Sequence, residues 1–358
     1  MKIAYITGFF DEKFYYREHA YAEYFCSKKN EYLILTSFLN LPQKKEGRPV
    51  DSGKYKVLRF PFLIRFKDFV ILNYFRELDK YSPDLIHVFD AQQGVGLLAI
   101  MWAQKRNIPI VYDHELQRIP SSFFGRIRFY LISYPLIKYF LKKADLIRVV
   151  TPASIALINR IHNCPQNKIS LGYLGYSDNF EQNAQLPFLF DDQFEYIMTS
   201  GFFDRSKNIE SIVSGFLLHW RNNRNSRLLI IGTIENEKVV KLIESNDSIF
   251  HYKKFLSVEQ LNYLYSKVRI HIWPKSTSSI FEALKFNDFV ILKHGDDTSH
   301  LVSDQIVFIS DFNMFNVSKK ICDLIYKPLK SDNLKFSYNM ILSRLKSSYE
   351  QLIFRKGE

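Results

Sequence analysis

The chain has 358 residues, which is too long for one ordinary hydrophobic core and fits two domains of about 150–180 residues each. Hydrophobic residues make up 47% and charged residues 24%, which excludes a disordered or low-complexity chain. No run reaches the ~18 uncharged apolar residues of a membrane span, and the first residues read as a strand rather than a signal peptide. The three cysteines lie far apart, so we expect neither disulfides nor a zinc site, and a cytoplasmic location.

The balance of charge and aromatic residues is unusual. A net charge of +12 favours an anionic partner, which means nucleic acid, an anionic membrane surface or a phosphorylated small molecule. The cations are scattered and no RNP, helix-turn-helix or zinc pattern occurs, so we expect no nucleic-acid partner. Aromatic residues make up 16% of the chain, which the base composition of the source genome would also explain.

The first half alternates short apolar runs with helical patterns. The expected strands are 2–7, 32–36, 56–59, 85–88, 110–112 and 146–150, and the expected helices include 17–28, 66–80 and 94–105. Most of these strands are apolar on both faces, as buried parallel strands are. The alternation predicts an α/β fold with a doubly wound parallel sheet.

The second half repeats this alternation after a polar linker at 181–193. The expected strands are 196–200, 228–232, 249–252, 270–273 and 289–293, and the expected helices are 209–221, 237–245, 258–267 and 280–287. A last helix begins near residue 333. We therefore predict an N-terminal domain at 1–180, a C-terminal domain at 194–332 and a helix at 333–358 that crosses back to the N-terminal domain.

Ligands of open α/β sheets bind beyond the carboxyl ends of the strands, so the residues that follow each strand are the site candidates. Gly8 follows the first strand and would allow a tight turn. Asp113-His114-Glu115 follows the strand at 110–112, and His114 would donate a hydrogen bond or move a proton near neutral pH. The alternative is a structural histidine, which is how we interpret His87 inside the strand at 85–88.

The segment Gly201–Asn208 follows the first strand of the second domain. It places Arg205 and Lys207 just before a helix, where two cations and free amides would hold a diphosphate. A solvated, charged turn is the alternative.

The segment Trp273–Leu284 carries the strongest local pattern, a strand end followed by a hydroxyl-rich turn and a helix. Amides at Ser278, Ser279 and Ile280 would hold phosphate, and Glu282 would accept hydrogen bonds from ribose hydroxyls. Alternatively, Glu282 completes a capping box with Ser279, since the two are three residues apart.

The order of these segments resembles a family of retaining glycosyltransferases called group 1 or family 4, which has the GT-B fold of two Rossmann-like domains facing across a cleft. The resemblance extends over nearly the whole chain. Segment 82–88 resembles the family's "PDxIHxH" strand, segment 144–147 its "ADxxIxxS" segment, and segment 168–178 its "KIxVIxLGVD" segment. Segment 201–207 resembles the "GRLxxxKG" loop, and segments 276–284 and 289–291 resemble the E-x7-E signature.

The resemblance implies that Lys207 contacts the donor diphosphate, Glu282 holds the donor ribose, and His114 lies near the reacting centre. Gly8 would lie in the first glycine-bearing loop. It also implies sugar transfer with retention of anomeric configuration, a nucleotide diphosphate sugar as donor substrate, no cofactor and no obligatory metal. Two positions depart from the pattern: Pro274 stands where the first glutamate of E-x7-E is expected, and Phe202 replaces the loop arginine. Arg205 is the candidate replacement for that arginine.

Two basic, aromatic stretches bear on the acceptor. Segments 54–67 and 121–143 mix Phe and Tyr with Lys and Arg, which favours peripheral contact with an anionic membrane, although the apolar sides would equally suit packing on a sheet. We expect a hexosyltransferase-type enzyme at the inner face of the cell membrane that acts on a glycan or lipid-linked acceptor in surface polysaccharide or lipopolysaccharide synthesis. The alternatives are a non-catalytic GT-B partner subunit and a sugar-nucleotide epimerase, although no extra acid/base carboxylates for an epimerase stand out.

Overall fold

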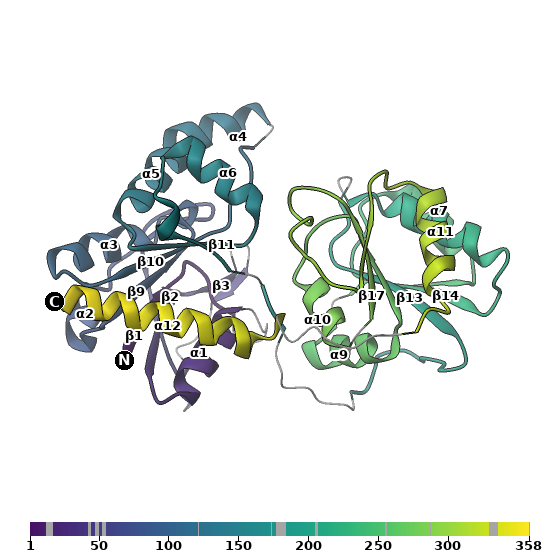
Figure 1. The fold of residues 1–358 in the computed structure, drawn as a ribbon, viewed down its shortest axis with the longest axis horizontal. Coiled ribbons are helices and arrows are strands. Elements are labelled where there is room, and N and C mark those ends of the chain that lie inside the picture. The colour runs from purple at the N-terminus through teal and green to yellow at the C-terminus, as the bar shows by residue number, and fades with distance from the viewer. Residues whose placement is uncertain are drawn as a thin grey trace. The chain divides into compact units, whose positions relative to one another are not determined.

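The computed structural model describes residues 1–11, 17–41, 44–46, 50–51, 55–120, 122–172, 174–176, 184–204, 207–254, 256–286, 288–328 and 336–357, with the backbone alone at 40–41, 44–46, 50–51 and 357. The chain forms two compact units (Figure 1). Unit 1 comprises Met1–Tyr173 and Ile341–Glu358, and unit 2 comprises Leu174–Met340. Each unit has its own hydrophobic core, as the chain length requires.

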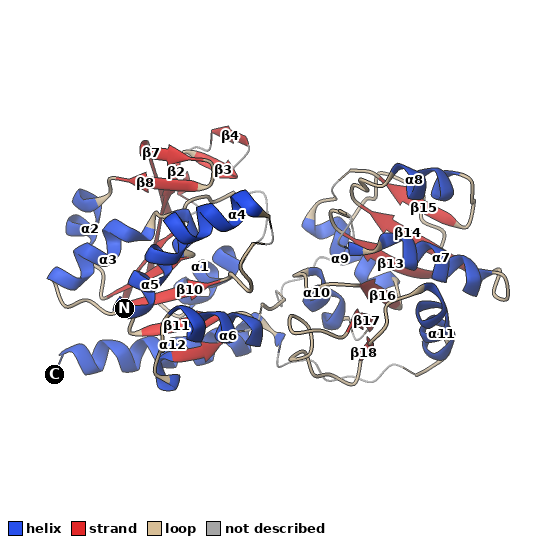
Figure 2. Cartoon of the chain, turned by 90° about the horizontal axis from the view of Figure 1, so that it is seen from above, coloured by secondary structure: helices blue, strands red, loops and turns tan. Residues whose placement is uncertain are grey.

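Unit 1 is built on an eight-stranded sheet in the order β12-β11-β10-β9-β1-β2-β6-β5. All neighbours are parallel except β5 and β6, so the sheet is the expected doubly wound type (Figure 2). The main strands are buried and rich in β-branched residues, which suits a sheet covered on both faces. The strands are β1 (Lys2–Ile6), β2 (Glu31–Ser37), β5 (Val50–Asp51), β6 (Lys56–Phe60), β9 (Leu85–Phe89), β10 (Ile110–His114), β11 (Leu146–Val149) and β12 (Ile169–Leu171).

Helices cover both faces of this sheet. Helix α3 packs on β9 and helix α5 on β10, whereas α1 and the C-terminal helix α12 lie on the opposite face (Figure 1). Helix α6 begins after Thr151, whose side chain accepts from the Ser154 amide and caps the helix. The helices are α1 (Arg17–Ser27), α2 (Phe75–Tyr81), η1 (Ala91–Gln93), α3 (Gly96–Lys105), α4 (Phe123–Arg128), the π-helix η2 (Phe129–Ser133), α5 (Tyr134–Lys143), α6 (Pro152–Ile161), η3 (Gln166–Lys168) and α12 (Tyr338–Gly357).

One sequence-based expectation for unit 1 is wrong. The helix expected at 66–80 is a hairpin of β7 (Phe62–Phe66) and β8 (Phe69–Leu72) followed by the short α2, and a second small hairpin joins β3 (Leu39–Leu41) and β4 (Lys44–Glu46). The turn between β7 and β8 places Lys67 at φ 53, a left-handed conformation that a helix excludes. The run Phe-Val-Ile-Leu that follows has strand rather than helix propensity.

Unit 2 contains a six-stranded, entirely parallel sheet in the order β15-β14-β13-β16-β17-β18. Helices α7 and α11 pack together on one face, and α9 and α10 on the other (Figure 1). Helix α9 begins with a complete capping box between Ser257 and Gln260. The elements are β13 (Glu195–Ser200), α7 (Ile209–Trp220), β14 (Ser226–Ile231), α8 (Glu237–Glu244), β15 (Ile249–Tyr252), α9 (Val258–Lys267), β16 (Ile270–Trp273), α10 (Ser279–Lys285), β17 (Phe289–Lys293), β18 (Ile306–Ile309) and α11 (Met314–Leu324).

The C-terminal helix α12 returns to unit 1 (Figure 1). Just before it, the Tyr176 amide donates to the Phe336 carbonyl, and the Tyr338 amide donates to the Tyr176 carbonyl. The two stretches of chain next to the boundary between the units are therefore paired like adjacent strands. Among the described residues, no helix is both long enough and apolar enough to span a bilayer.

Candidate functional site

The strand order of unit 2 creates one switch point, where the chain leaves β13 toward β14 on one side and β16 lies on the other. In doubly wound sheets, ligands bind beyond the carboxyl ends of the strands at such a point. The segment Gly201–Asn208 follows β13, and Pro274 and Lys275 follow β16. The two segments that the sequence singled out in this half therefore meet at the switch point of one sheet.

The turn after β13 is held against β14 by a very close approach of two glycines. Gly201 and Gly232 have φ values of +131° and +122°, which other residues rarely adopt. A Cβ atom on Gly232 would lie 1.9 Å from the Gly201 carbonyl oxygen. The Phe203 amide then donates to the Thr233 carbonyl at 2.8 Å. These contacts fix the path of the chain that carries Lys207.

Lys207 and Lys275 bring two positive charges together at this edge. The Lys207 ammonium lies 3.7 Å from the position that a Cβ atom on Gly201 would take, so it lies over the end of β13. Burial lowers the pKa of Lys207, the carboxylate of Asp204 opposes that effect, and the charge of Lys275 lowers the pKa further. Two cations that repel one another in a partly buried place favour an anion between them. Lys275 stands within the segment Trp273–Leu284, but no local pattern singles out this lysine.

A hydroxyl-lined group lies next to these lysines, between β13, α9 and α10. The Ser200 hydroxyl is 3.0 Å from the Tyr265 hydroxyl, and Tyr265 also hydrogen-bonds Ser279. Burial raises the pKa of Tyr265 to about 12, with a smaller contribution from the negative charge of Glu282. The Trp273 indole donates to the Ser200 carbonyl at 3.0 Å and ties β16 to β13. The structure therefore brings Ser279 and Glu282 together with the end of β13.

Helix α10 begins without the capping box considered above. Its N-cap is the exposed Ser278, which makes no side-chain cap hydrogen bond, and Ser279 is already the first helical residue. Glu282 lies in the first turn and is half-buried. The Ile280 amide donates to the Thr277 carbonyl at 3.3 Å, so this N–H is engaged within the turn. Arg205 lies outside the described residues.

A cavity of about 610 Å³ lies next to the start of α7, and its charged lining consists of the carboxylates of Asp204, Glu210, Glu235 and Glu237 together with Lys238. The excess of negative charge there disfavours phosphate.

In unit 1 the switch point lies between β1 and β9. Gly8 follows β1, and its amide donates to Gln93 Oε1 at 2.6 Å, in the η1 turn that follows β9. A Cβ atom on Gly8 would lie 2.7 Å from the same oxygen. Gly8 thus lets the loops that follow β1 and β9 pack together at the switch point.

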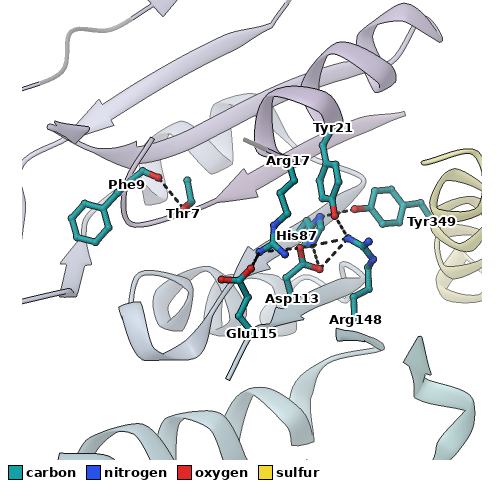
Figure 3. A network of polar contacts seen from close by, with 9 residues as sticks. All are labelled: Thr7, Phe9, Arg17, Tyr21, His87, Asp113, Glu115, Arg148 and Tyr349. Carbon is teal, nitrogen blue, oxygen red and sulfur yellow. Dashed lines mark hydrogen bonds and ion pairs between the residues drawn. The ribbon is translucent and has the colours of Figure 1, made fainter. Parts of the chain in front are cut away.

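His114 and Asp113 end β10 rather than follow it, and both side chains are buried. Asp113 is the centre of a charged network (Figure 3). Arg148 Nη1 is 3.1 Å and His87 Nε2 3.0 Å from Asp113 Oδ1, and Arg17 pairs with Glu115 at 2.9 Å. Burial alone would raise the pKa of Asp113, but its neighbours, Arg148 first, hold it well below the usual range. Asp113 is therefore a structural anion, and His87 is structural as expected.

His114 is isolated from that network. Its Nδ1 is 2.8 Å from the Tyr112 hydroxyl, which also accepts from the Ala91 amide at 3.4 Å. Either tautomer of His114 satisfies this contact, because a hydroxyl oxygen can accept two hydrogen bonds and donate one. Burial lowers the pKa of His114 to about 4, so the ring is neutral at pH 7. A neutral imidazole holds no spare proton for acid catalysis, and the Nε2 atom of His114 is itself buried.

Asp90, which follows β9, is the residue that sequence reasoning missed. It is 8% exposed and adopts φ 22, a conformation that strains a residue with a side chain. The Asp90 amide donates to the Asp113 carbonyl at 3.0 Å, and its carboxylate accepts from the Gln92 amide at 3.2 Å. Burial, and then the charge of Glu115, raise the pKa of Asp90 to about 7. This places a carboxyl group of raised pKa beside Tyr112.

No protein-family model and no curated protein sequence matches the chain. Solved structures do match it over its full length. Sucrose-phosphate synthase from Thermosynechococcus elongatus has a TM-score of 0.68 at 14% identity, covering 99% of this chain and 100% of that one. WaaG, a glycosyltransferase involved in lipopolysaccharide biosynthesis, has a TM-score of 0.59 at 12% identity, covering 98% and 94%.

A third match is a protein of Listeria monocytogenes named as a UDP-N-acetylglucosamine 2-epimerase. Its TM-score is 0.60 at 12% identity, and the match covers 98% of this chain and 97% of that one. At these identities the matches establish the fold. The chain thus has the two Rossmann-like α/β units of GT-B glycosyltransferases.

Proposed function

We propose that this protein is a glycosyltransferase of the hexosyltransferase type, which uses a nucleotide diphosphate sugar bound by unit 2. The observation that carries the proposal is the convergence of Lys207 and Lys275 beyond the switch point of the unit 2 sheet. Two fixed cations at the place where doubly wound sheets bind ligands suit a diphosphate. In the transfer step they would stabilise the negative charge that develops on the departing nucleoside diphosphate.

The same edge supplies groups for the rest of the donor. Glu282 would accept hydrogen bonds from the ribose hydroxyls, and Ser278, Ser279 and Arg205 would contact the phosphates. The tie between Tyr265 and both Ser200 and Ser279 supports this arrangement, because it fixes the turn that holds these residues. Lys275 stands directly after Pro274, so a cation lies beside the position where the related family has its first glutamate.

The acceptor would bind at unit 1, near the ends of β1, β9 and β10. We propose a glycan or lipid-linked acceptor of surface polysaccharide or lipopolysaccharide synthesis at the cytoplasmic face of the membrane, with retention of anomeric configuration. His114, buried and neutral at the end of β10, would lie near the reacting centre. The likeness of the fold to a lipopolysaccharide glycosyltransferase supports this choice of acceptor.

A sugar-nucleotide epimerase is the second candidate, and one observation favours it. Asp90 titrates near neutrality and lies within electrostatic reach of Glu115. Two neighbouring carboxyl groups, one of them with a raised pKa, suit acid/base chemistry on a sugar carbon. The likeness of the fold to an epimerase is consistent with it. A non-catalytic partner subunit would instead bind the nucleotide and convert nothing.

Product analysis separates the candidates. The protein is incubated with each nucleotide sugar of a panel, with and without an acceptor, and the sugar products are followed by NMR. With the acceptor present, a transferase yields an acceptor-linked sugar and free nucleoside diphosphate. Without the acceptor, it at most hydrolyses the donor slowly. Conversion of the donor to its C2 epimer without an acceptor would establish the epimerase. An unchanged donor under every condition would leave the partner subunit.

A further inference from the structure

Helix α4 and the π-helix η2 of unit 1 expose large apolar side chains. None of the six residues of α4 is buried. Phe123 is 73%, Phe124 81% and Leu131 73% exposed, and Ile127 and Tyr130 are exposed as well. The same continuous helical stretch is anchored to the core at Phe129, which is buried. The stretch thus carries a row of aromatic and aliphatic side chains that no described residue covers.

The β7–β8 hairpin exposes a second apolar group. Leu63, Ile64 and Phe66 are each more than half exposed, while the other strand of the hairpin buries Val70 and Leu72 in the core. Both the hairpin and η2 contact the η1 turn, so the two apolar groups flank the same part of unit 1. We call the two groups together the apolar rim, which consists of Leu63, Ile64, Phe66, Phe123, Phe124, Ile127, Tyr130 and Leu131.

Cations outnumber acidic residues around the apolar rim, with Asp68 beside Lys67 at the tip of the hairpin. No Asp or Glu stands between Glu115 and Asp145, whereas six cations do: Arg118, Arg126, Arg128, Lys138, Lys142 and Lys143. Neither Arg126 nor Arg128 has an ion-pair partner among the described residues. A protein surface would have to match eight apolar side chains on two elements, whereas a lipid surface adapts to their shape.

We propose that the apolar rim is a membrane-docking surface that inserts into the headgroup layer of a bilayer rich in anionic lipid. Side chains of Phe and Leu would enter the boundary between the headgroups and the acyl chains, while the flanking Arg and Lys pair with lipid phosphates. An apolar row flanked by cations is typical of a helix that lies in the membrane interface, as opposed to a helix that spans the bilayer. Surface insertion also agrees with the absence of a spanning helix among the described residues.

The apolar rim lies near the residues proposed to bind the acceptor. The choice of acceptor that follows from this rests on the proposed function. The η1 turn that both rim elements contact begins directly after Asp90, and its Ala91 amide contacts the Tyr112 hydroxyl that orients His114. A membrane surface at the rim therefore lies next to the proposed acceptor residues. An acceptor whose lipid tail stays in the bilayer would present its sugar there, so the docking surface selects lipid-linked acceptors.

Vesicle flotation tests the docking surface without any reference to activity. The full-length protein is mixed with vesicles of phosphatidylcholine alone or with phosphatidylglycerol added, and the bound fraction is measured. We expect the protein to bind only to the anionic vesicles. The double variant Phe123→Ser/Phe124→Ser should bind them at least tenfold more weakly, because it loses the free energy gained when two large apolar side chains leave water. Arg126→Glu should weaken binding about fivefold, which corresponds to about 1 kcal/mol.

Matched controls keep this result specific. Phe315 and Tyr326 of unit 2 are 64% and 76% exposed, so Phe315→Ser and Tyr326→Ser should bind vesicles like the wild-type protein. Circular dichroism would verify that each variant is folded. A wild-type protein that stays in the soluble fraction, or rim variants that float equally well, would overturn the proposal. So would a wild-type dimer that becomes monomeric in Phe124→Ser, since the rim would then bind a second copy. Nucleotide-sugar turnover in detergent-free buffer reports separately on the proposed function.

Discussion

The Tyr349 hydroxyl of α12 lies 2.6 Å from Nδ1 of His87 in the central strand β9, although 262 residues separate the two in the chain. The opposite ring nitrogen of His87 lies 3.0 Å from Asp113, so the C-terminal helix is joined to the charged network of unit 1 (Figure 3). Tyr349 also stacks on Phe25 of α1 at 5.1 Å between ring centres. The last helix is therefore an integral part of the first folding unit.

Tyr349→Phe should lower the free energy of unfolding by about 1–3 kcal/mol, because it leaves the buried Nδ1 of His87 without its donor while the stacked ring stays in place. Chemical denaturation measures this, with Ser347→Ala on the exposed side of α12 as the control that should change little. Equal stability of the two variants would mean that the hydroxyl contributes nothing to the docking of α12.

Asp113→Asn should be far more damaging, at about 3–5 kcal/mol, because it leaves the buried guanidinium groups of Arg148 and Arg17 without their shared anion. The measurement is again the denaturation midpoint, and a variant that expresses only as an insoluble protein agrees with the prediction. A loss below 1 kcal/mol would contradict the central role of Asp113.

The contribution of His114 to stability should fall on mild acidification. Burial lowers the pKa of His114 to about 4, below the value near 6.5 of an unfolded histidine. The unfolded chain therefore binds a proton more readily, and the stability that the neutral ring provides is lost as the pH falls from about 6.5 toward 4. In the same window Asp90 has the opposite effect, since its raised pKa makes protonation stabilise the folded state.

The variant His114→Gln should consequently lose less stability between pH 6.5 and 4 than the wild-type protein. Thermal melting at a series of pH values measures the difference. Parallel curves for the two proteins would show that His114 does not titrate in this way.

Gly232→Ala should disrupt the proposed diphosphate site of unit 2. Its Cβ would meet the Gly201 carbonyl oxygen at 1.9 Å, and its φ of +122° is strained for alanine, so the two turns must separate. We expect a lower melting temperature and loss of nucleotide binding. Gly295→Ala is the matched control, because its Cβ would meet only the Asp297 side chain, at 3.2 Å.

Asp90→Asn should change the pH profile of turnover. If Asp90 takes part in the reaction, the wild-type rate should show a transition near pH 7, where its carboxyl group titrates, and the variant should lose that transition. If the two proteins have the same pH profile, Asp90 has a structural role only, and its strained φ of 22° is needed for the β9–η1 turn.

Much of the fold was predictable because buried parallel strands leave a clear pattern. The strands at Ile249–Tyr252, Ile270–Trp273 and Phe289–Lys293 have the predicted bounds, since each is a short apolar run between polar turns. The hairpin at Phe62–Leu72 was not predictable in this way, because the apolar residues of β7 face solvent while those of β8 are buried. Sequence patterns predict strands and helices on the assumption that apolar residues are buried, and exposed aromatic residues violate that assumption.

The candidate site was predictable only in part. Position after a strand pointed to Lys207 and His114, because the carboxyl ends of parallel strands meet at one edge. Lys275 and Asp90 follow strands as well, but their importance depends on which strands are neighbours in the sheet. Strand order sets β16 beside β13 and β9 beside β1, and no local pattern reveals that order.

The central claim is that unit 2 holds a nucleotide diphosphate sugar between Lys207 and Lys275. The most direct test measures release of free nucleoside diphosphate from a panel of nucleotide sugars by the wild-type protein and by Lys207→Ala, Lys275→Ala and Glu282→Ala, with Lys238→Ala at the acidic cavity as the control. We predict release from one donor, a loss of about 10- to 100-fold in each of the three variants, and an unchanged control. No release from any donor, even with lipid-linked acceptors, together with no nucleotide binding by calorimetry, would contradict the account.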